Sequence, residues 1–276
     1  PGIIAGGVSQ LNMLVDTILA SLLPTGSPSW LYVSDRLMQL PLGIFAIAIA
    51  TVILPRLSSL FVIEDKRSFS DTLDWSIKLI LLIGVPAVIG LIMLAEPIIL
   101  TLFERGQFNA GDSLQASYSL IALAFGLVAF MLIKILTPSF FARQEPKKPM
   151  YIAFASMILN AVLAWVLGFS LGYGHVGLAM ASSISAIFTV MALLFLLFYE
   201  DVYSPSSGWI VFWARLVLAS MILIIFLGYF GEEAASLRKS DDLEQVFYIL
   251  KMVLFSVGLY MVVLRLTGLK IKDFLN

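Results

Sequence analysis

The sequence predicts an all-α membrane protein, a polytopic bundle of about eight transmembrane helices. Of its 276 residues, 60% are hydrophobic and only 13% are charged, and the mean hydropathy is +0.99. Soluble domains are about half apolar and about a quarter charged, so this chain has too little polar surface to face water. The apolar runs are long and do not alternate as strands do, which favours helices over a barrel.

A helix needs about 20 apolar residues to cross a bilayer. Eight segments meet this requirement, at 3–23, 29–55, 74–95, 114–141, 149–171, 176–199, 209–230 and 246–266. The stretches between them are polar or rich in proline and glycine, and none has room for a soluble domain. The chain opens with PGIIAGG, without a starting Met or a basic leader, so we expect residue 1 to lie inside a longer protein.

The distribution of Lys and Arg between alternate loops predicts the orientation in the membrane. One side collects ten basic residues and the other collects three. The first set is Arg56, Lys66, Arg67, Lys78, Arg143, Lys147, Lys148, Arg265, Lys270 and Lys272, and the second is Arg105, Arg238 and Lys239. We expect the first side to be cytoplasmic. With eight spans, both ends of the chain are then in the cytoplasm.

Several classes of function are disfavoured by what the chain lacks. It has no cysteine, which excludes disulfides and thiolate metal sites, and its one histidine, His175, lies beside glycines and is expected in a loop. No metal site, no phosphate-binding loop and no basic nucleic-acid-binding domain is predicted. An intramembrane enzyme would need clustered acids or histidines at one depth, and the carboxylates here are scattered, so we do not expect an enzyme.

Four motifs carry a resemblance to a known family. They are WLYVSDRLMQLPLGIFAIAIATVILPRLS at 30–58, LFERGQF at 102–108, FFARQEPKKP at 140–149 and GHVGLAMASSISA at 174–186. In this order and spacing they resemble the MurJ (MviN) family, the bacterial lipid II flippases of the MOP exporter superfamily. Members of that family have fourteen helices, and this chain resembles the last eight.

The resemblance implies a MATE-like fold with two parts: residues 1–200 as the second six-helix lobe and 201–276 as two further helices that form a groove for a lipid tail. It implies transport of undecaprenyl-pyrophosphate-linked muropeptide (lipid II) from the inner to the outer leaflet of the bacterial cytoplasmic membrane, for peptidoglycan synthesis. The implied partners are lipid II, membrane lipids and the missing first lobe. The alternatives are a flippase for another polyprenyl-linked glycan, a MATE-like exporter, or a scaffold in the cell-wall machinery.

Charges inside spans are rare and costly, so each is a candidate functional group. Arg36 lies in the second predicted span, and its planar, permanently charged fork suits the oxygens of a diphosphate. Gln39 lies three residues on and shares its helix face, whereas Asp35 points elsewhere and is expected to orient or support the site. The resemblance implies that Arg36 lines the central cavity and binds substrate.

A second group of polar residues suggests a cation or proton site. Asn12 and Asp16 are four residues apart in the first span and can face one cavity. The resemblance implies that an aspartate here joins an amide, matched by Asn160, and a further carboxylate to hold sodium. This chain has Ala164 at the carboxylate position, which counts against a sodium site. A buried polar contact between helices is the alternative.

Three residues are hinge candidates because they disturb the helical hydrogen-bond ladder within spans. They are Pro41 and Gly43 in the second span and Pro138 in the fourth. Kinks without motion are equally compatible with this pattern. We expect no bound cofactor. Export of an anionic lipid is downhill in an inside-negative potential, so coupling to the membrane potential, with or without a monovalent cation, is expected.

Overall fold

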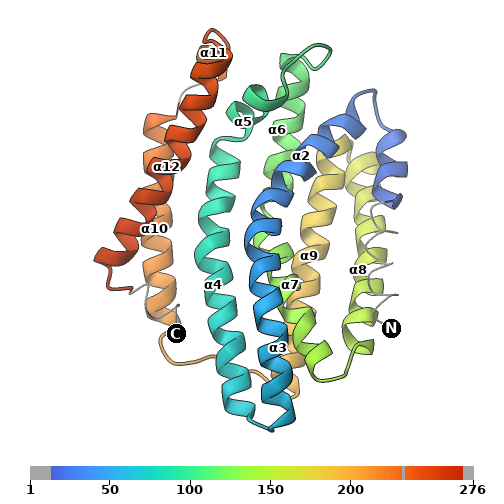
Figure 1. The fold of residues 1–276 in the computed structure, drawn as a ribbon. Helices are drawn as coiled ribbons and strands as arrows, with labels where there is room; N and C mark the ends of the chain where they lie inside the picture. Colours follow the sequence, from blue (N-terminus) through green and yellow to red (C-terminus); the bar gives the residue numbers. More distant parts are fainter. Residues whose placement is uncertain (1–13, 232–233, 270–276) are drawn as a thin grey trace.

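The computed structural model describes residues 14–231 and 234–269, and in this part of the chain all regular structure is helical. Residues 14–21 form a helical segment. The further elements are α2 (Ser27–Pro41), η1 (Leu42–Ile47), α3 (Ala48–Val62), α4 (Lys66–Met93), α5 (Ala95–Phe103), α6 (Ala110–Ala124), α7 (Leu127–Ala142), α8 (Lys147–Trp165), η2 (Val166–Ser170), α9 (Gly174–Tyr199), α10 (Trp209–Phe230), α11 (Ala234–Leu237) and α12 (Asp242–Leu266). Figure 1 shows the long helices running side by side as a bundle, which confirms the all-α prediction.

Within the described residues, six helices are long and apolar enough to cross a membrane, and a seventh span results if the bent pair α6 and α7 counts as one. These correspond to the last seven of the eight predicted spans. Most of the first predicted span, 3–23, lies outside the described residues. The chain is therefore a multi-pass membrane protein.

Several helices extend beyond the predicted spans. The second span belongs to one helix of 36 residues, Ser27–Val62, in which α2 passes through the π-helix η1 into α3. The polar stretch after Pro55 was expected to be a loop, but the helix continues to Val62 because polar side chains at a span end can face water without breaking backbone hydrogen bonds. His175, expected in a loop, instead lies in the first turn of α9 and is buried.

The fourth span is bent at Phe125–Gly126. The axes of α6 and α7 differ by 43°, while α7 continues as a helix through Pro138. The Ser183 hydroxyl of α9 donates to the Ala122 carbonyl at 2.7 Å, which satisfies a group at the break. A Cβ at Gly126 would lie 2.7 Å from Ser183, so only glycine allows this close approach of the two helices.

One end of the bundle, the lower end in Figure 1, contains the α3–α4 and α7–α8 turns and the α9–α10 linker. There Glu200, at the end of α9, accepts from Arg143 at 2.7 Å and from Lys148 at 2.6 Å. Burial raises the pKa of Glu200, but the two cations lower it by a larger amount. The pKa of Glu200 therefore lies below its ordinary value. Glu145 bridges the same two cations. The network joins α7, α8 and α9.

At the opposite end, Arg238 follows the short helix α11 and binds two carboxylates. Its guanidinium lies 2.9 Å from Glu96 of α5 and 3.0 Å from Glu104 of the ERGQF motif. Arg105 of the same motif makes an exposed ion pair with Asp242 at 3.3 Å. These contacts explain the motif as a structural turn that ties the loop between α10 and α12 to the rest of the bundle.

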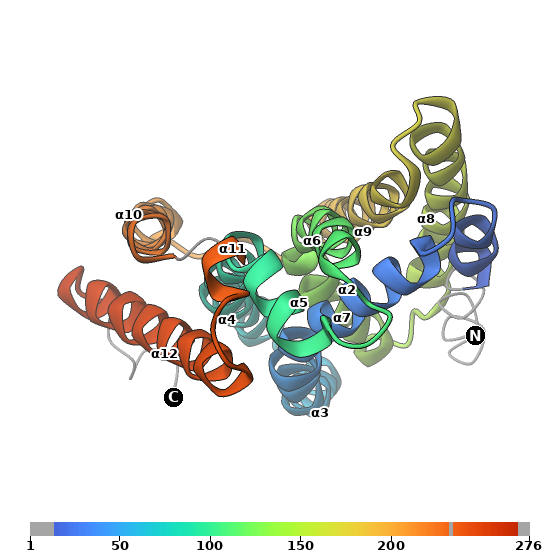
Figure 2. The ribbon, with the colours of Figure 1, turned by 90° about the horizontal axis from the view of Figure 1, so that it is seen from above.

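Helices α10 and α12 pack against each other and against α4 at one edge of the molecule (Figure 2). The linker that leads into α10 is bound by Asp74 of α4, whose side chain is 3% exposed. Asp74 accepts from Tyr203 at 2.8 Å, from Trp209 at 2.7 Å and from the Ser206 hydroxyl at 2.6 Å. The Lys78 ammonium group, one turn later on α4, forms an ion pair with the same carboxylate at 2.7 Å. One carboxylate thus fixes where the last two long helices join the bundle.

We predict that Asp74→Ala releases this linker. Removal of one partner from a buried ion pair costs about 3 to 5 kcal/mol, because the other charge is left uncompensated. The variant should lose thermal stability and become open to chymotrypsin after Tyr203, which is buried in the native protein. Asp71→Ala is the matched control, because Asp71 is an exposed aspartate on the same helix. Equal protease resistance of the two variants would contradict the anchoring role of Asp74.

Candidate functional site

The SDRLM motif lies on α2, and one face of this helix is anchored to α6. The Trp30 indole donates to Asp112 at 2.8 Å, and the Ser34 hydroxyl donates to the Ala116 carbonyl at 2.7 Å. Val33 and Leu37, on the same side, are buried. Because these contacts fix the rotation of α2, Arg36 is held on its exposed side.

Arg36 is exposed, and it forms no ion pair within the part of the chain that the structure describes. It lies about 14 Å along the helix from Ser27, at 1.5 Å per residue, and so well inside the span. The guanidinium lies over the ring of Tyr32, whose centroid is 4.8 Å from the guanidinium carbon. The guanidinium donors are therefore available to an anion.

The other two predicted substrate-binding residues contact each other. The Gln39 side-chain amide donates to the Asp35 carboxylate, one turn earlier on α2. Gln39 is exposed beside Arg36, whereas Asp35 is half-buried. One oxygen of the Asp35 carboxylate is thus bonded to a neutral amide, and among the described residues Asp35 and Arg36 form no direct ion pair.

Two of the three predicted cation-site residues lie together, although they are 144 positions apart in the chain. Asn160 of α8 donates to Asp16 at 2.9 Å. Ser182 of α9, which the sequence interpretation placed only in a helix-packing face, lies 3.4 Å from both Asp16 and Asn160. The third predicted residue, Asn12, lies outside the described residues. The cluster contains oxygens that a proton or a small cation can use.

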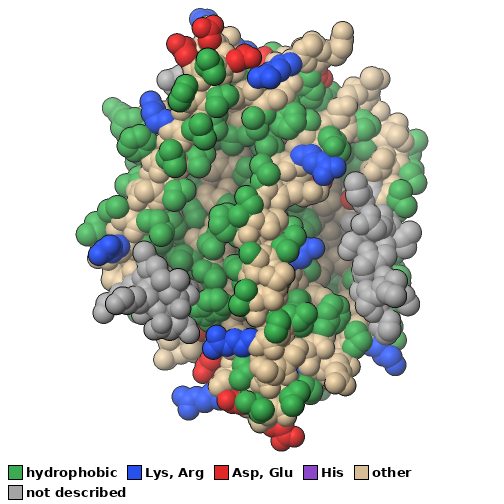
Figure 3. Space-filling model, viewed as in Figure 1, with side chains coloured by type: hydrophobic (Ala, Val, Ile, Leu, Met, Phe, Trp, Pro, Cys, Tyr) green, Lys and Arg blue, Asp and Glu red, His purple; other side chains and the backbone are tan. Residues whose placement is uncertain are grey.

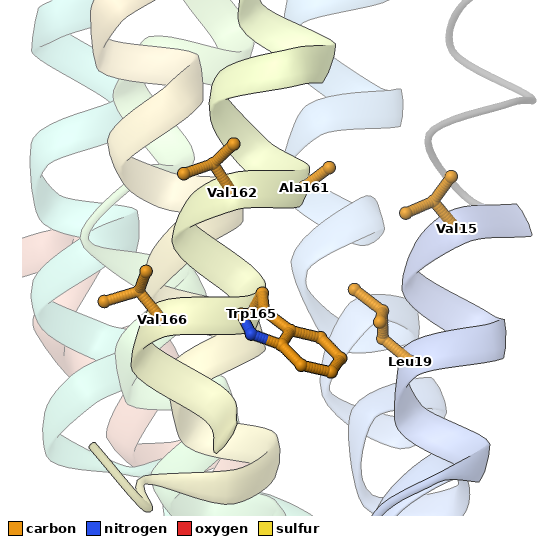
Figure 4. Close-up of a pocket in the computed structure, with 6 residues that line it drawn as sticks. All are labelled: Val15, Leu19, Ala161, Val162, Trp165 and Val166. Atoms are coloured by element: carbon orange, nitrogen blue, oxygen red, sulfur yellow. The ribbon is translucent and has the colours of Figure 1, made fainter. Parts of the chain in front are cut away.

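The position where the family resemblance implied a further carboxylate is apolar and closed. Ala164 has no exposed surface and packs with Ala20, Leu178 and Ala181. An open groove of about 350 Å³ between residues 14–21 and α8–η2 has an apolar lining (Figure 4), made of Val15, Leu19, Ala161, Val162, Trp165 and Val166. Within the described residues, no group of three or more His, Cys, Asp or Glu side chains is arranged to hold a metal.

The predicted hinge residues of the second span lie where the helix changes its geometry. Pro41 is the last residue of α2, and the π-helix η1 begins at Leu42 and contains Gly43. π-Helical turns within α-helices are frequent at functional sites. A Cβ built at Gly43 meets no atom within 4 Å, so packing does not require glycine there.

A second cation within a predicted span is also exposed. Lys134, near the middle of α7, is exposed. In Figure 3, acidic side chains are found mainly at the upper and lower ends of the molecule, while several Lys and Arg side chains lie between them among hydrophobic groups. A surface with unpaired positive charges at membrane depth is suited to an anionic ligand and poorly suited to acyl chains.

Comparisons with known proteins agree with this architecture. The model of the family described as lipid II flippase MurJ matches residues 1–237. A probable lipid II flippase MurJ of Vibrio cholerae is 41% identical over 278 residues, covering 99% of this chain and 52% of that protein. A probable lipid II flippase MurJ of Haemophilus influenzae is 40% identical, covering 98% of this chain and 54% of that protein.

Solved structures give the same result. A lipid II flippase MurJ in an inward closed conformation is similar with a TM-score of 0.77 and 28% identity, covering 93% of this chain and 50% of that one. An outward-facing MATE family multidrug resistance transporter of the MOP superfamily shares the fold, with a TM-score of 0.63 at 18% identity over 95% of this chain and 61% of that one. The chain spans about half the length of the curated relatives that it matches. It belongs to the family of the lipid II flippase MurJ.

Proposed function

We propose that this chain supplies the second lobe and the last two helices of a lipid II flippase. The whole transporter moves the undecaprenyl-pyrophosphate-linked muropeptide from the inner to the outer leaflet of the bacterial cytoplasmic membrane. Membership of the family and the similarity to a solved flippase support this proposal. Because the chain spans about half of its relatives, a first lobe is the partner that closes the central cavity.

The observation that carries the proposal is the exposed guanidinium of Arg36 on α2. A diphosphate carries negative charge on several oxygens, and a planar fork of N–H donors binds two of them at once. Lys134 adds a second exposed cation on the same lobe. Binding and release require no covalent change in the substrate, so the lobe needs no catalytic acid, base or metal.

A flippase for another polyprenyl-linked glycan, or a MATE-like exporter, is the second candidate. The fold similarity to MATE transporters supports it at the level of architecture alone. A guanidinium would bind the diphosphate of any polyprenyl carrier equally well, so Arg36 alone does not select lipid II. Competition between lipid II and an unrelated polyprenyl diphosphate in a transport assay distinguishes these candidates.

The orientation follows from the same basic residues that predict topology. The end of the bundle with Arg143 and Lys148 carries the excess of positive charge, which supports a cytoplasmic location for this end and for both chain ends. Outward movement of an anionic headgroup then follows the inside-negative potential. This is worth about 2.3 kcal/mol for each charge and 100 mV, so membrane potential is the driving force we propose.

We predict that Arg36→Ala in the full-length protein abolishes complementation of cells depleted of their flippase. Arg36→Lys should also be impaired, because lysine keeps the charge but loses the bidentate geometry. Membrane insertion of both variants should be normal, since Arg36 is exposed and packs with no buried group. Growth at the wild-type rate with Arg36→Ala would remove the substrate-binding role.

We predict that Gly43→Ala slows transport while raising stability slightly, by about 0.5 to 1 kcal/mol. The substitution fits sterically, so its effect on transport would reflect a stiffer helix at η1. Gly90→Ala in α4 is the control, because a Cβ there also meets nothing within 4 Å. A transport rate unchanged by Gly43→Ala, as measured in vesicles, would argue against bending at this point.

We predict that Asp16→Asn removes any dependence of transport on a monovalent cation or on a pH gradient. Asparagine can still bond to Asn160 but carries no charge, so packing of the helix pair is kept. The measurement is substrate flipping in vesicles with imposed Na⁺, K⁺ or pH gradients, each at a fixed membrane potential. The same ion dependence in the wild type and in Asp16→Asn would exclude this cluster as the coupling site.

A further inference from the structure

The exposed position of Arg36 raises a physical difficulty for substrate binding. An arginine side chain has many rotamers, and ordering them on binding costs free energy that reduces affinity. A guanidinium that is already held in its binding direction avoids most of this cost. The lobe therefore gains affinity if a neighbouring group restrains Arg36 without occupying its N–H donors.

A carboxylate partner would restrain the side chain but would also compete with a phosphate. The carboxylate adjacent in sequence, Asp35, is bonded to Gln39 instead. The contact that Arg36 does make is with an aromatic face: the Tyr32 ring centroid lies 4.8 Å from its guanidinium carbon. Tyr32 is one helical turn earlier and is 55% exposed, so it lies on the same open face.

An aromatic ring can restrain the Arg36 side chain without occupying its N–H donors. The ring attracts the cation through its quadrupole and leaves the N–H groups at the edge of the guanidinium plane free for hydrogen bonds. The attraction is stronger where water is excluded from the pair. The phenol hydroxyl is not needed for this contact, whereas the ring is.

We propose that Tyr32 is a positioning residue for substrate binding, which holds Arg36 in the direction from which it grips the diphosphate. This inference rests on the proposed function, and it adds a residue that the SDRLM motif does not contain. Tyr32 acts through Arg36 and does not itself contact the substrate.

The test measures the Kd of the full-length protein in nanodiscs for lipid II. Tyr32→Leu should weaken binding about 2- to 30-fold, the range to which cation–π energies correspond. Tyr32→Phe and Tyr32→Trp keep an aromatic face and should bind within about twofold of the wild type. The control is Tyr151→Leu, since Tyr151 is a tyrosine of α8 with a similar exposure of 64%, and its Kd should not change.

A double variant separates positioning from direct contact. If Tyr32 acts through Arg36, Tyr32→Leu combined with Arg36→Ala should bind no more weakly than Arg36→Ala alone. A further loss in the double variant would mean that the ring contacts the substrate, and would overturn the proposal. So would wild-type affinity of Tyr32→Leu while Arg36→Ala binds weakly. Wild-type affinity of Arg36→Ala would instead remove the proposed function itself.

Discussion

A permanent positive charge in a membrane-spanning helix is the feature on which the rest of this lobe depends. Insertion of an arginine at mid-helix costs about 2.5 to 3.5 kcal/mol, and a guanidinium cannot reduce that cost by losing its proton. The charge must therefore face water or an anion. Anchoring of the opposite face of α2 to α6, through Trp30 and Ser34, sets the rotation of the helix that achieves this. The packing of α2 against α6 thus keeps the charge of Arg36 away from the apolar interior of the bundle.

The ion pairs between described residues lie at the two ends of the bundle. At one end, the Asp74 and Glu200 networks join α4, α7, α8 and α9 to the linker before α10. At the other end, Arg238 joins α5 to the loop before α12. Between the ends lie the π-helix η1 and the bend at Gly126, where the backbone ladder is irregular. Bending at these two irregular points, with the ion pairs at the helix ends kept, is what the flippase mechanism that we propose would require of this chain.

The sequence predicted the parts of this structure that depend on composition and local pattern. Apolar runs identified the spans that the structure describes, and the rarity of charge within spans made Arg36 a candidate that the structure leaves exposed. The bend of the fourth span was not predictable, because it depends on contact between Gly126 and Ser183, which are 57 positions apart. Asp74 was taken as the first residue of a span, and its role requires knowledge of where a distant linker returns. Tyr32 was missed although its spacing of four residues from Arg36 on a helix was a usable signal.

Ala164 occupies the position where the family resemblance implies a carboxylate, and this difference bears on how transport is coupled to an ion. A single lost carboxylate would leave a void or an unpaired partner, and neither is present: Ala164 is sealed among Ala20, Leu178 and Ala181. The neighbours thus fit an alanine, and they leave no room at that position for a hydrated ion. Among the described residues, Asp16 is the carboxylate that is hydrogen-bonded to the neutral amide of Asn160. A single carboxylate with amide and hydroxyl neighbours is a weaker set of ligands for Na⁺ than a pair of carboxylates, since charge count largely sets the affinity for hard cations. If this cluster takes part in coupling, its ligands suit a proton better than Na⁺, which is consistent with our proposal that the electrical potential acts on the substrate's own charge.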